Sequence, residues 1–213
     1  MWVVTGAAVV SGLVDLFCIA KGWSKARYLW KPGTMVLVIF LAVWGANLSG
    51  HEVSASQGWL IAGLLLSLVG DVFLVLPSDR FIAGLASFLL AHFFYIAAFP
   101  QAVDAQGSGW WVAGVLVLFG IGYFAVLRRG VLKSGGYGLL AAVVLYILVI
   151  LAMVWRAWLS GQGLILAGAG FFMVSDSILA WNRFVKPSLL AEVSVMATYF
   201  AAQIVLAWSV SLI

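Results

Sequence analysis

The sequence predicts an all-α integral membrane protein with eight transmembrane helices in a single domain over residues 1–213. Of its 213 residues, 65% are hydrophobic and only 8% are charged, whereas about a quarter of the residues in a soluble domain are charged. So few charged side chains cannot cover a soluble surface. Apolar runs long enough to cross about 30 Å of hydrocarbon also recur along the chain, separated by short polar breaks.

The first half of the chain contains four apolar runs, and the second half contains four more. The run at the N-terminus has no basic segment before it and contains Asp15, so we interpret it as a retained helix and not as a cleaved signal peptide. In chain order the runs lie near 2–20, 32–48, 59–76, 81–99, 110–127, 136–155, 163–181 and 190–212.

The prolines and the basic residues support this division of the chain. Proline is tolerated at helix ends, and all four prolines fall at the ends of runs: Pro32, Pro77, Pro100 and Pro187. Ten of the 11 basic residues follow the first, third, fifth or seventh run, and only Arg156 lies on the other side. The positive-inside rule therefore predicts that both termini lie outside the cytoplasm, and we expect a bacterial inner membrane. The net charge of +4 gives no reason to expect a nucleic-acid partner.

One short similarity suggests an internal repeat. The segments GDVFLVL at 70–76 and SDSILAW at 175–181 both contain an aspartate after a small residue, and Arg-Phe follows each of them shortly afterwards. The aspartates are half a chain apart, which favours a four-plus-four parallel tandem repeat with equivalent third and seventh helices. Short apolar matches also arise by chance, so both explanations stay open.

Three predicted helices carry a carboxylate near their cytoplasmic end. Asp15, Asp71 and Asp176 each lie about five residues before that end, and burying such a group in a membrane costs about 2.5 to 3.5 kcal/mol. Each aspartate could hydrogen-bond a neighbouring helix and only hold the bundle together. Alternatively, the three could face one cavity and form a functional site.

Other polar residues follow helical spacing on two of the runs. The fourth run presents Gly84, Phe88, His92 and Tyr95 on one face, and the eighth presents Glu192, Met196, Tyr199 and Gln203. A single buried histidine is more often structural than catalytic. Lys31, at the start of the second run, could extend to the lipid headgroups.

The remaining residues exclude several kinds of catalytic site. Histidines and acids lack the spacing of metal ligands, Cys18 is the only cysteine, and no serine lies in a nucleophile elbow. We therefore expect neither a metal nor an organic cofactor. Paired carboxylates remain, and two acids in a setting of low polarity do not ionise together easily, so one of them can serve as a general acid.

Taken together, the motifs resemble those of the YhhN-like family of lysoplasmalogenases, in the same order over nearly the whole chain. They are KPGT at 31–34, GDVFLVL at 70–76, F-x₂-G-x₃-F-x₃-H-x₂-Y at 81–95, FFMVSDSILAWNRF at 171–184 and Y-x₃-Q at 199–203. The resemblance implies an eight-helix membrane hydrolase that cleaves the vinyl-ether bond of a lysoplasmalogen. The products would be a fatty aldehyde and glycerophosphoethanolamine or glycerophosphocholine.

The resemblance also implies which residues form the site. Asp71 and Asp176 match the two motif aspartates and would be catalytic, whereas Asp15 matches no motif position. Further polar positions, which would bind the lysophospholipid substrate, are matched by Lys31, His92, Tyr95, Asn182, Tyr199 and Gln203.

The chemistry of vinyl ethers agrees with a pair of carboxylates. A general acid protonates the alkene carbon, and a nearby anion stabilises the oxocarbenium ion that water captures, as in glycosidases. We expect Asp71 to hold the proton, Asp176 to stabilise the cation and position water, and Lys31 to lie near the substrate phosphate.

Two other functions agree with a membrane protein that contains buried acids. A proton-coupled transporter of small molecules or lipids would also carry intramembrane aspartates, although no proline interrupts a predicted helix as at many transporter sites. The second of these alternatives is a non-catalytic protein that binds lipid or acts as a scaffold. The sequence predicts no oligomeric state.

Overall fold

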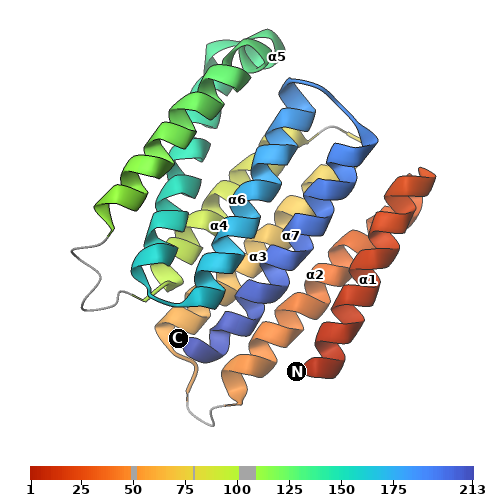
Figure 1. Cartoon of the computed structure of the whole chain (residues 1–213). Helices are drawn as coiled ribbons and strands as arrows, with labels where there is room; N and C mark the ends of the chain where they lie inside the picture. The colour runs from red at the N-terminus through yellow and green to blue at the C-terminus, as the bar shows by residue number, and fades with distance from the viewer. Residues whose placement is uncertain (49–51, 79, 101–108) are drawn as a thin grey trace.

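The computed structural model describes residues 1–48, 52–78, 80–100 and 109–213, and no strand occurs within these ranges. They contain seven α-helices that are long and apolar enough to cross a membrane (Figure 1). These are α1 (Trp2–Lys21), α2 (Ser24–Asn47), α3 (Ala55–Val75), α4 (Phe81–Ala98), α5 (Trp110–Leu159), α6 (Gly163–Phe184) and α7 (Leu189–Ser209), followed by the short 3₁₀ helix η2 (Val210–Leu212). The prediction of an all-α, multi-pass membrane protein is confirmed.

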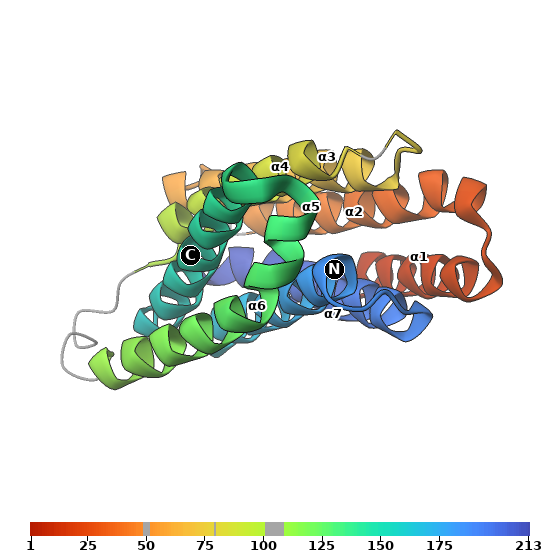
Figure 2. The ribbon, with the colours of Figure 1, turned by 90° about the horizontal axis from the view of Figure 1, so that it is seen from above.

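The helices form two rows with α7 near the centre. Seen from above, α2, α3 and α4 lie in one row, and α1, α7 and α6 lie in the other (Figure 2). Each helix from α1 to α6 packs against the next one, and α7 contacts α6, α1, α2 and α3. Asp71 on α3 and Tyr199 and Gln203 on α7 are therefore buried among the surrounding helices.

The predicted count of eight separate helices is not confirmed, and the difference lies in α5. This element includes both predicted runs 110–127 and 136–155, and its 50 residues would extend about 75 Å if straight. Gly135 and Gly136 have non-helical backbone angles, and Gly136 has φ 65° and ψ −158°, a region that is essentially restricted to glycine. The chain turns back there, so α5 has two antiparallel arms (Figure 1).

The second helix begins earlier than its apolar run predicts. α2 starts at Ser24, and Pro32 lies inside it instead of at its end. The prediction for this proline is therefore wrong. Residues 24–31 continue the helix beyond the apolar run and carry basic side chains, including Arg27 and Lys31, which the helical geometry directs toward the neighbouring helices.

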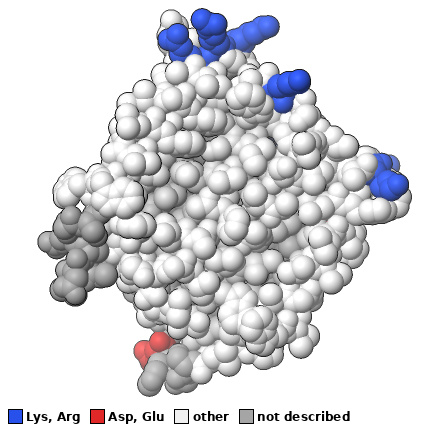
Figure 3. Space-filling view, viewed as in Figure 1, with Lys and Arg blue, Asp and Glu red and all other residues white. Residues whose placement is uncertain are grey.

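The two ends of the molecule differ in charge. Lys and Arg side chains gather where α5 turns back and around the adjoining helix ends, whereas both termini lie at the opposite end (Figures 1 and 3). The aspartates lie toward this basic end of the bundle, because Asp71 is four residues before the end of α3 and Asp15 is six before the end of α1. Asp176 is eight residues before the end of α6, since α6 extends beyond the predicted run to Phe184.

Candidate functional site

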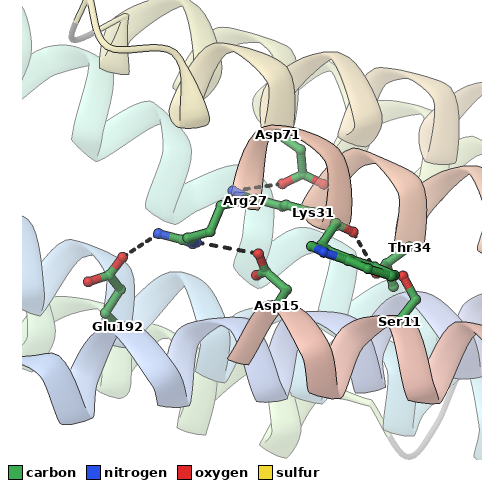
Figure 4. Close-up of polar contacts among 8 residues, drawn as sticks. Ser11, Asp15, Arg27, Lys31, Thr34, Asp71 and Glu192 are labelled. Atoms are coloured by element: carbon green, nitrogen blue, oxygen red, sulfur yellow. Dashed lines mark hydrogen bonds and ion pairs between the residues drawn. The ribbon is translucent and has the colours of Figure 1, made fainter. Parts of the chain in front are cut away.

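Asp71 on α3 forms a buried ion pair. Its side chain is 1% exposed, and its Oδ1 lies 3.1 Å from Nζ of Lys31 on α2 (Figure 4). The phenol of Tyr199 on α7 donates a hydrogen bond to Oδ2 at 2.6 Å. An ammonium group at this distance stabilises the carboxylate form of its partner. Lys31 therefore turns inward to a carboxylate and does not extend to the headgroups.

Asp176 on α6 has only uncharged hydrogen-bonding groups close to it among the described contacts. The phenol of Tyr146, on the second arm of α5, donates to Oδ2 at 2.5 Å. Nε2 of His92 on α4 lies 3.6 Å from the same oxygen, and the Asp176 side chain is 11% exposed. In contrast to Asp71, this carboxyl group is accessible from a cavity.

His92 offers an acceptor toward Asp176. Its Nδ1 lies 2.6 Å from the carbonyl oxygen of Phe88, and because a carbonyl can only accept, Nδ1 carries the hydrogen. In the neutral ring Nε2 is then an acceptor, and it has no hydrogen-bond partner among the described residues, since its distance of 3.6 Å from Asp176 is longer than a hydrogen bond. An acceptor near a carboxyl oxygen favours a protonated carboxyl group, so the surroundings of Asp176 suit a bound proton.

A cluster of aromatic rings connects the two aspartates. The ring of Tyr199, which binds Asp71, lies 5.7 Å from the ring of Phe172. The ring of Phe172 lies 4.7 Å from that of His92, the neighbour of Asp176. The structure thus brings Asp71, Asp176, Tyr199 and His92 into one site between α3, α4, α6 and α7.

Tyr95 and Gln203 lie in a second buried group. The phenol of Tyr95 donates to Oε1 of Gln203 at 3.0 Å and pairs with Oγ of Ser67 at 3.1 Å. Tyr95 and Gln203 are completely buried. Neither lines a described cavity, so their contacts connect α3, α4 and α7 behind the aspartates.

Asn182 lies at the basic end of the bundle, away from both carboxylates. Its Oδ1 accepts a hydrogen bond from the backbone N–H of Ser188 at 2.7 Å. This contact fixes the connection between α6 and α7, and Asn182 also lines a polar cavity at that end.

Asp15 belongs to a separate ionic cluster. It is completely buried, and its Oδ1 lies 3.4 Å from Nε of Arg27, whose Nη1 lies 2.5 Å from Oε1 of Glu192 (Figure 4). This cluster joins α1, α2 and α7. Of the three aspartates, only Asp176 lines a described cavity, so the expectation that all three face one cavity is not confirmed.

Two neighbouring cavities share part of their lining, and Asp176 lines one of them. A narrow, mainly apolar slot of about 50 Å³ lies between α4, α5 and α6, and the carboxyl group of Asp176 lies in its wall. A larger cavity of about 660 Å³ opens at the basic end of the bundle. Both are lined by the same three side chains, Leu74, Phe81 and Leu179. A ligand with a polar head and an apolar tail fits this arrangement.

Sequence reasoning missed Tyr146 and Arg27, the partners of Asp176 and Asp15. Tyr146 stands out only as a hydroxyl group within an apolar run, and the basic residues after the first run do not indicate which of them points inward. Within the described ranges, no three His, Cys, Asp or Glu residues are placed to hold a metal ion.

Comparison with known proteins gives a consistent set of relatives. The model of the YhhN family matches residues 26–210. Lysoplasmalogenase TMEM86B of Mus musculus is 34% identical over 185 residues, which cover 86% of this chain and 74% of the relative. The lysoplasmalogenase of Mycobacterium tuberculosis is 31% identical over 224 aligned residues, covering 96% and 81% of the two chains. No solved structure matches the chain significantly.

Proposed function

Because the chain belongs to the YhhN family, we propose that it is a membrane hydrolase that cleaves the vinyl-ether bond of lysoplasmalogens. Water and a 1-alkenyl lysophospholipid would give a fatty aldehyde and a glycerophospho-alcohol such as glycerophosphoethanolamine or glycerophosphocholine. The relatives named lysoplasmalogenase, in mammals and in Mycobacterium, support this reaction. The apolar slot beside a carboxyl group supports it independently.

The observation that carries the proposal is the position of Asp176. Its carboxyl group lies in the wall of the slot, where the alkenyl chain of a lysolipid would lie. His92 beside it presents an acceptor and no positive charge, which suits a proton held for transfer to carbon. A positioned general acid contributes roughly 10²- to 10⁴-fold to a rate.

The geometry favours a division of roles opposite to the one expected from the sequence. Lys31 lies 3.1 Å from Asp71 and stabilises its carboxylate form, and Asp71 does not line the slot. We therefore assign the general acid to Asp176. Asp71 serves as the second, ionised aspartate. It accepts the hydrogen bond from Tyr199, whose ring packs against Phe172.

The reaction then proceeds in two proton transfers. Asp176 donates its proton to the alkene carbon farther from the ether oxygen, and the adjacent carbon becomes an oxocarbenium ion. The Asp176 carboxylate formed in this step, stabilised by the hydrogen bond from Tyr146, lies beside the cation and accepts a proton from the attacking water. The hemiacetal collapses to the aldehyde and the alcohol, and Asp176 is protonated again.

The other candidate residues have supporting roles in this proposal. His92 and Tyr199 hold the carboxyl groups through the contacts described above. Tyr95 and Gln203 stabilise the helices behind them, and Asn182 shapes the entrance. Lys31 acts on Asp71 and not directly on the substrate phosphate.

The fold also supports eight membrane crossings. Each arm of α5 includes a predicted apolar run, and both termini lie at the end opposite to the basic side chains (Figures 1 and 3). If α5 crosses the membrane twice, the number of crossings is even. An even number is required because both termini lie at the same end of the bundle. With the positive-inside rule, the termini and Arg156 would lie outside the cytoplasm. The bacterial inner membrane remains a prediction.

Two features support the four-plus-four repeat. Gly63 on α3 and Gly168 on α6 are as far apart in the sequence as Asp71 and Asp176, and a Cβ at either glycine would overlap a side chain of the following helix. The aspartates also take equivalent partners. Asp71 contacts α2 of its own half and α7 of the other half, whereas Asp176 contacts the second arm of α5 and α4.

An assay of the purified protein in detergent tests the proposed function. We expect release of fatty aldehyde from a 1-alkenyl lysophospholipid and none from the matching 1-acyl lysophospholipid, which lacks the alkene. In D₂O, immediate reduction of the product should trap one deuterium at the carbon next to the former carbonyl, because protonation occurs there. No aldehyde, or aldehyde without deuterium at that carbon, would contradict the proposal.

A further inference from the structure

The cavity at the basic end of the bundle, which we name the basic cavity, has a distinctive lining. Among the described residues that line it, four are cationic and one is anionic: Arg27, Lys31, Arg80, Arg183 and Glu192. A cavity of about 660 Å³ with this lining favours an anionic ligand. Its position at the end where Lys and Arg gather directs it toward the lipid headgroups (Figure 3).

Two of these cations already lie against carboxylates. Lys31 pairs with Asp71, and Arg27 lies between Asp15 and Glu192 (Figure 4). These contacts fix the side chains in the wall of the basic cavity. They also compensate part of the positive charge of Lys31 and Arg27.

Arg80 and Arg183 lie beside the same aromatic residue. Arg80 directly precedes Phe81 at the start of α4, and its Nε donates to Oγ of Ser78 at 3.0 Å. The guanidinium group of Arg183 lies over the ring of Phe81, 4.8 Å from its centre. Arg80, at the N-cap of α4, and Arg183 on α6 thus both line the basic cavity next to Phe81, and planar guanidinium groups suit the oxygens of a phosphate.

Phe81 also connects the basic cavity to the apolar slot. Its ring lines both spaces, together with Leu74 and Leu179, and the slot leads to Asp176. In a 1-alkenyl lysophospholipid, only the three-carbon glycerol separates the phosphate from the vinyl-ether oxygen. A phosphate held beside Phe81 would therefore place the vinyl ether where the slot begins, with the first carbons of the apolar chain entering it.

We propose that Arg80 and Arg183 form the binding site for the phosphodiester of the lysolipid headgroup. The proposal rests on the proposed function for the identity of the substrate, and it places the phosphate at these arginines instead of at Lys31. The three lining side chains that the cavities share, Leu74, Phe81 and Leu179, then mark the passage between headgroup and chain.

A binding experiment tests this site without depending on hydrolysis. The probes are a saturated 1-O-alkyl glycerophosphoethanolamine, which has no alkene to protonate, and the corresponding 1-O-alkylglycerol, which has no phosphate. Their affinities are measured for the purified full chain and for Arg80→Gln/Arg183→Gln in neutral detergent. We expect the double variant to lose on the order of 10- to 100-fold in affinity for the first probe and none for the second, because only charge-assisted bonds to phosphate are removed.

Arg128→Gln is the matched control, because Arg128 is exposed on α5 at the same end but does not line the basic cavity. It should retain wild-type affinity for both probes. Unchanged affinity of the double variant for the phosphate probe, equal loss for both probes, or no binding of the phosphate probe by the wild type would overturn the proposal. Displacement of the probe by an equal concentration of inorganic phosphate would also overturn it, since the site would then bind free anions.

The outcomes separate this proposal from the proposed function. If the wild type releases no aldehyde from a vinyl-ether lysolipid but shows the expected pattern with the two saturated probes, the hydrolase function fails and the phosphate site stands. If aldehyde is released but the double variant binds both probes normally, the hydrolase function stands and the phosphate site fails.

Discussion

Asp71 and Lys31 form a pair whose two members depend on each other. Their side chains are 1% and 6% exposed, so removing one charge leaves the other buried without compensation. Asp71→Asn should therefore lower the free energy of unfolding by about 3 to 5 kcal/mol. Thermal unfolding in detergent, followed by size-exclusion elution after heating, measures this loss.

The control removes both charges. Lys31→Met combined with Asp71→Asn leaves no buried ammonium group, so it should recover most of the stability that Asp71→Asn loses. Stability of Asp71→Asn equal to that of the wild type would show that Lys31 and Asp71 do not form the ion pair.

Tyr146 contributes a single hydrogen bond at the reacting carboxyl group. Its phenol stabilises the Asp176 carboxylate that forms when the proton is transferred to carbon. Tyr146→Phe should lower kcat about 10- to 100-fold, as expected for a hydrogen bond to a charged group, and should change stability little. Steady-state release of aldehyde measures the effect. Tyr137→Phe, at an 82% exposed position on the same helix, should behave like the wild type, and equal rates for the two variants would exclude this role for Tyr146.

The buried acids could be predicted from the sequence, but their partners could not. Asp71 and Asp176 stand out because charged residues are costly within apolar runs. Which charge pairs with which acid depends on the rotation and depth of several helices at once. From the sequence, Lys31 is therefore expected to bind the substrate phosphate, whereas the structure places its ammonium group against Asp71. Tyr146 carried no charge to mark it.

At the scale of the helices, α5 depends on one glycine. Gly136 has φ 65° and ψ −158°, where a side chain introduces backbone strain of about 1 to 3 kcal/mol. Gly136→Ala should lower the free energy of unfolding by that amount, as measured by thermal unfolding in detergent. Gly138→Ala is the control, because Gly138 is helical with open space around it and alanine favours a helix by about 0.5 to 1 kcal/mol. Equal effects of the two substitutions would contradict the account of the turn.

The extents of most helices could be predicted, because apolar length determines them. Two boundaries could not. Residues 24–31 continue α2 through Pro32, although an interior proline removes a helical hydrogen bond and crowds the carbonyl four residues before it, so neither apolar length nor the proline predicts this start. The break in α5 has no polar loop around it, so the seven helices of the described ranges include one element made from two predicted runs.

For the whole molecule, the charge distribution predicts the orientation. Single-cysteine variants at exposed positions, in a Cys18→Ala background, can be labelled from either side of the membrane with an impermeant thiol reagent. Cysteines near Lys25, Arg128 and Lys186 should react from the cytoplasmic side, and cysteines near either terminus from the other side. Labelling of the two termini from opposite sides would show an odd number of crossings and would exclude two crossings by α5.

The central claim for the whole molecule is that Asp176, in the wall of the apolar slot, donates the proton to the vinyl ether. The most direct test is the kcat of purified Asp176→Asn for a 1-alkenyl lysophospholipid, measured as released aldehyde alongside thermal stability. Asparagine can still accept the hydrogen bond from Tyr146 but has no acidic proton. We predict a loss of roughly 10²- to 10⁴-fold with stability close to the wild type, whereas a stable variant that keeps more than about a tenth of the activity would contradict the claim.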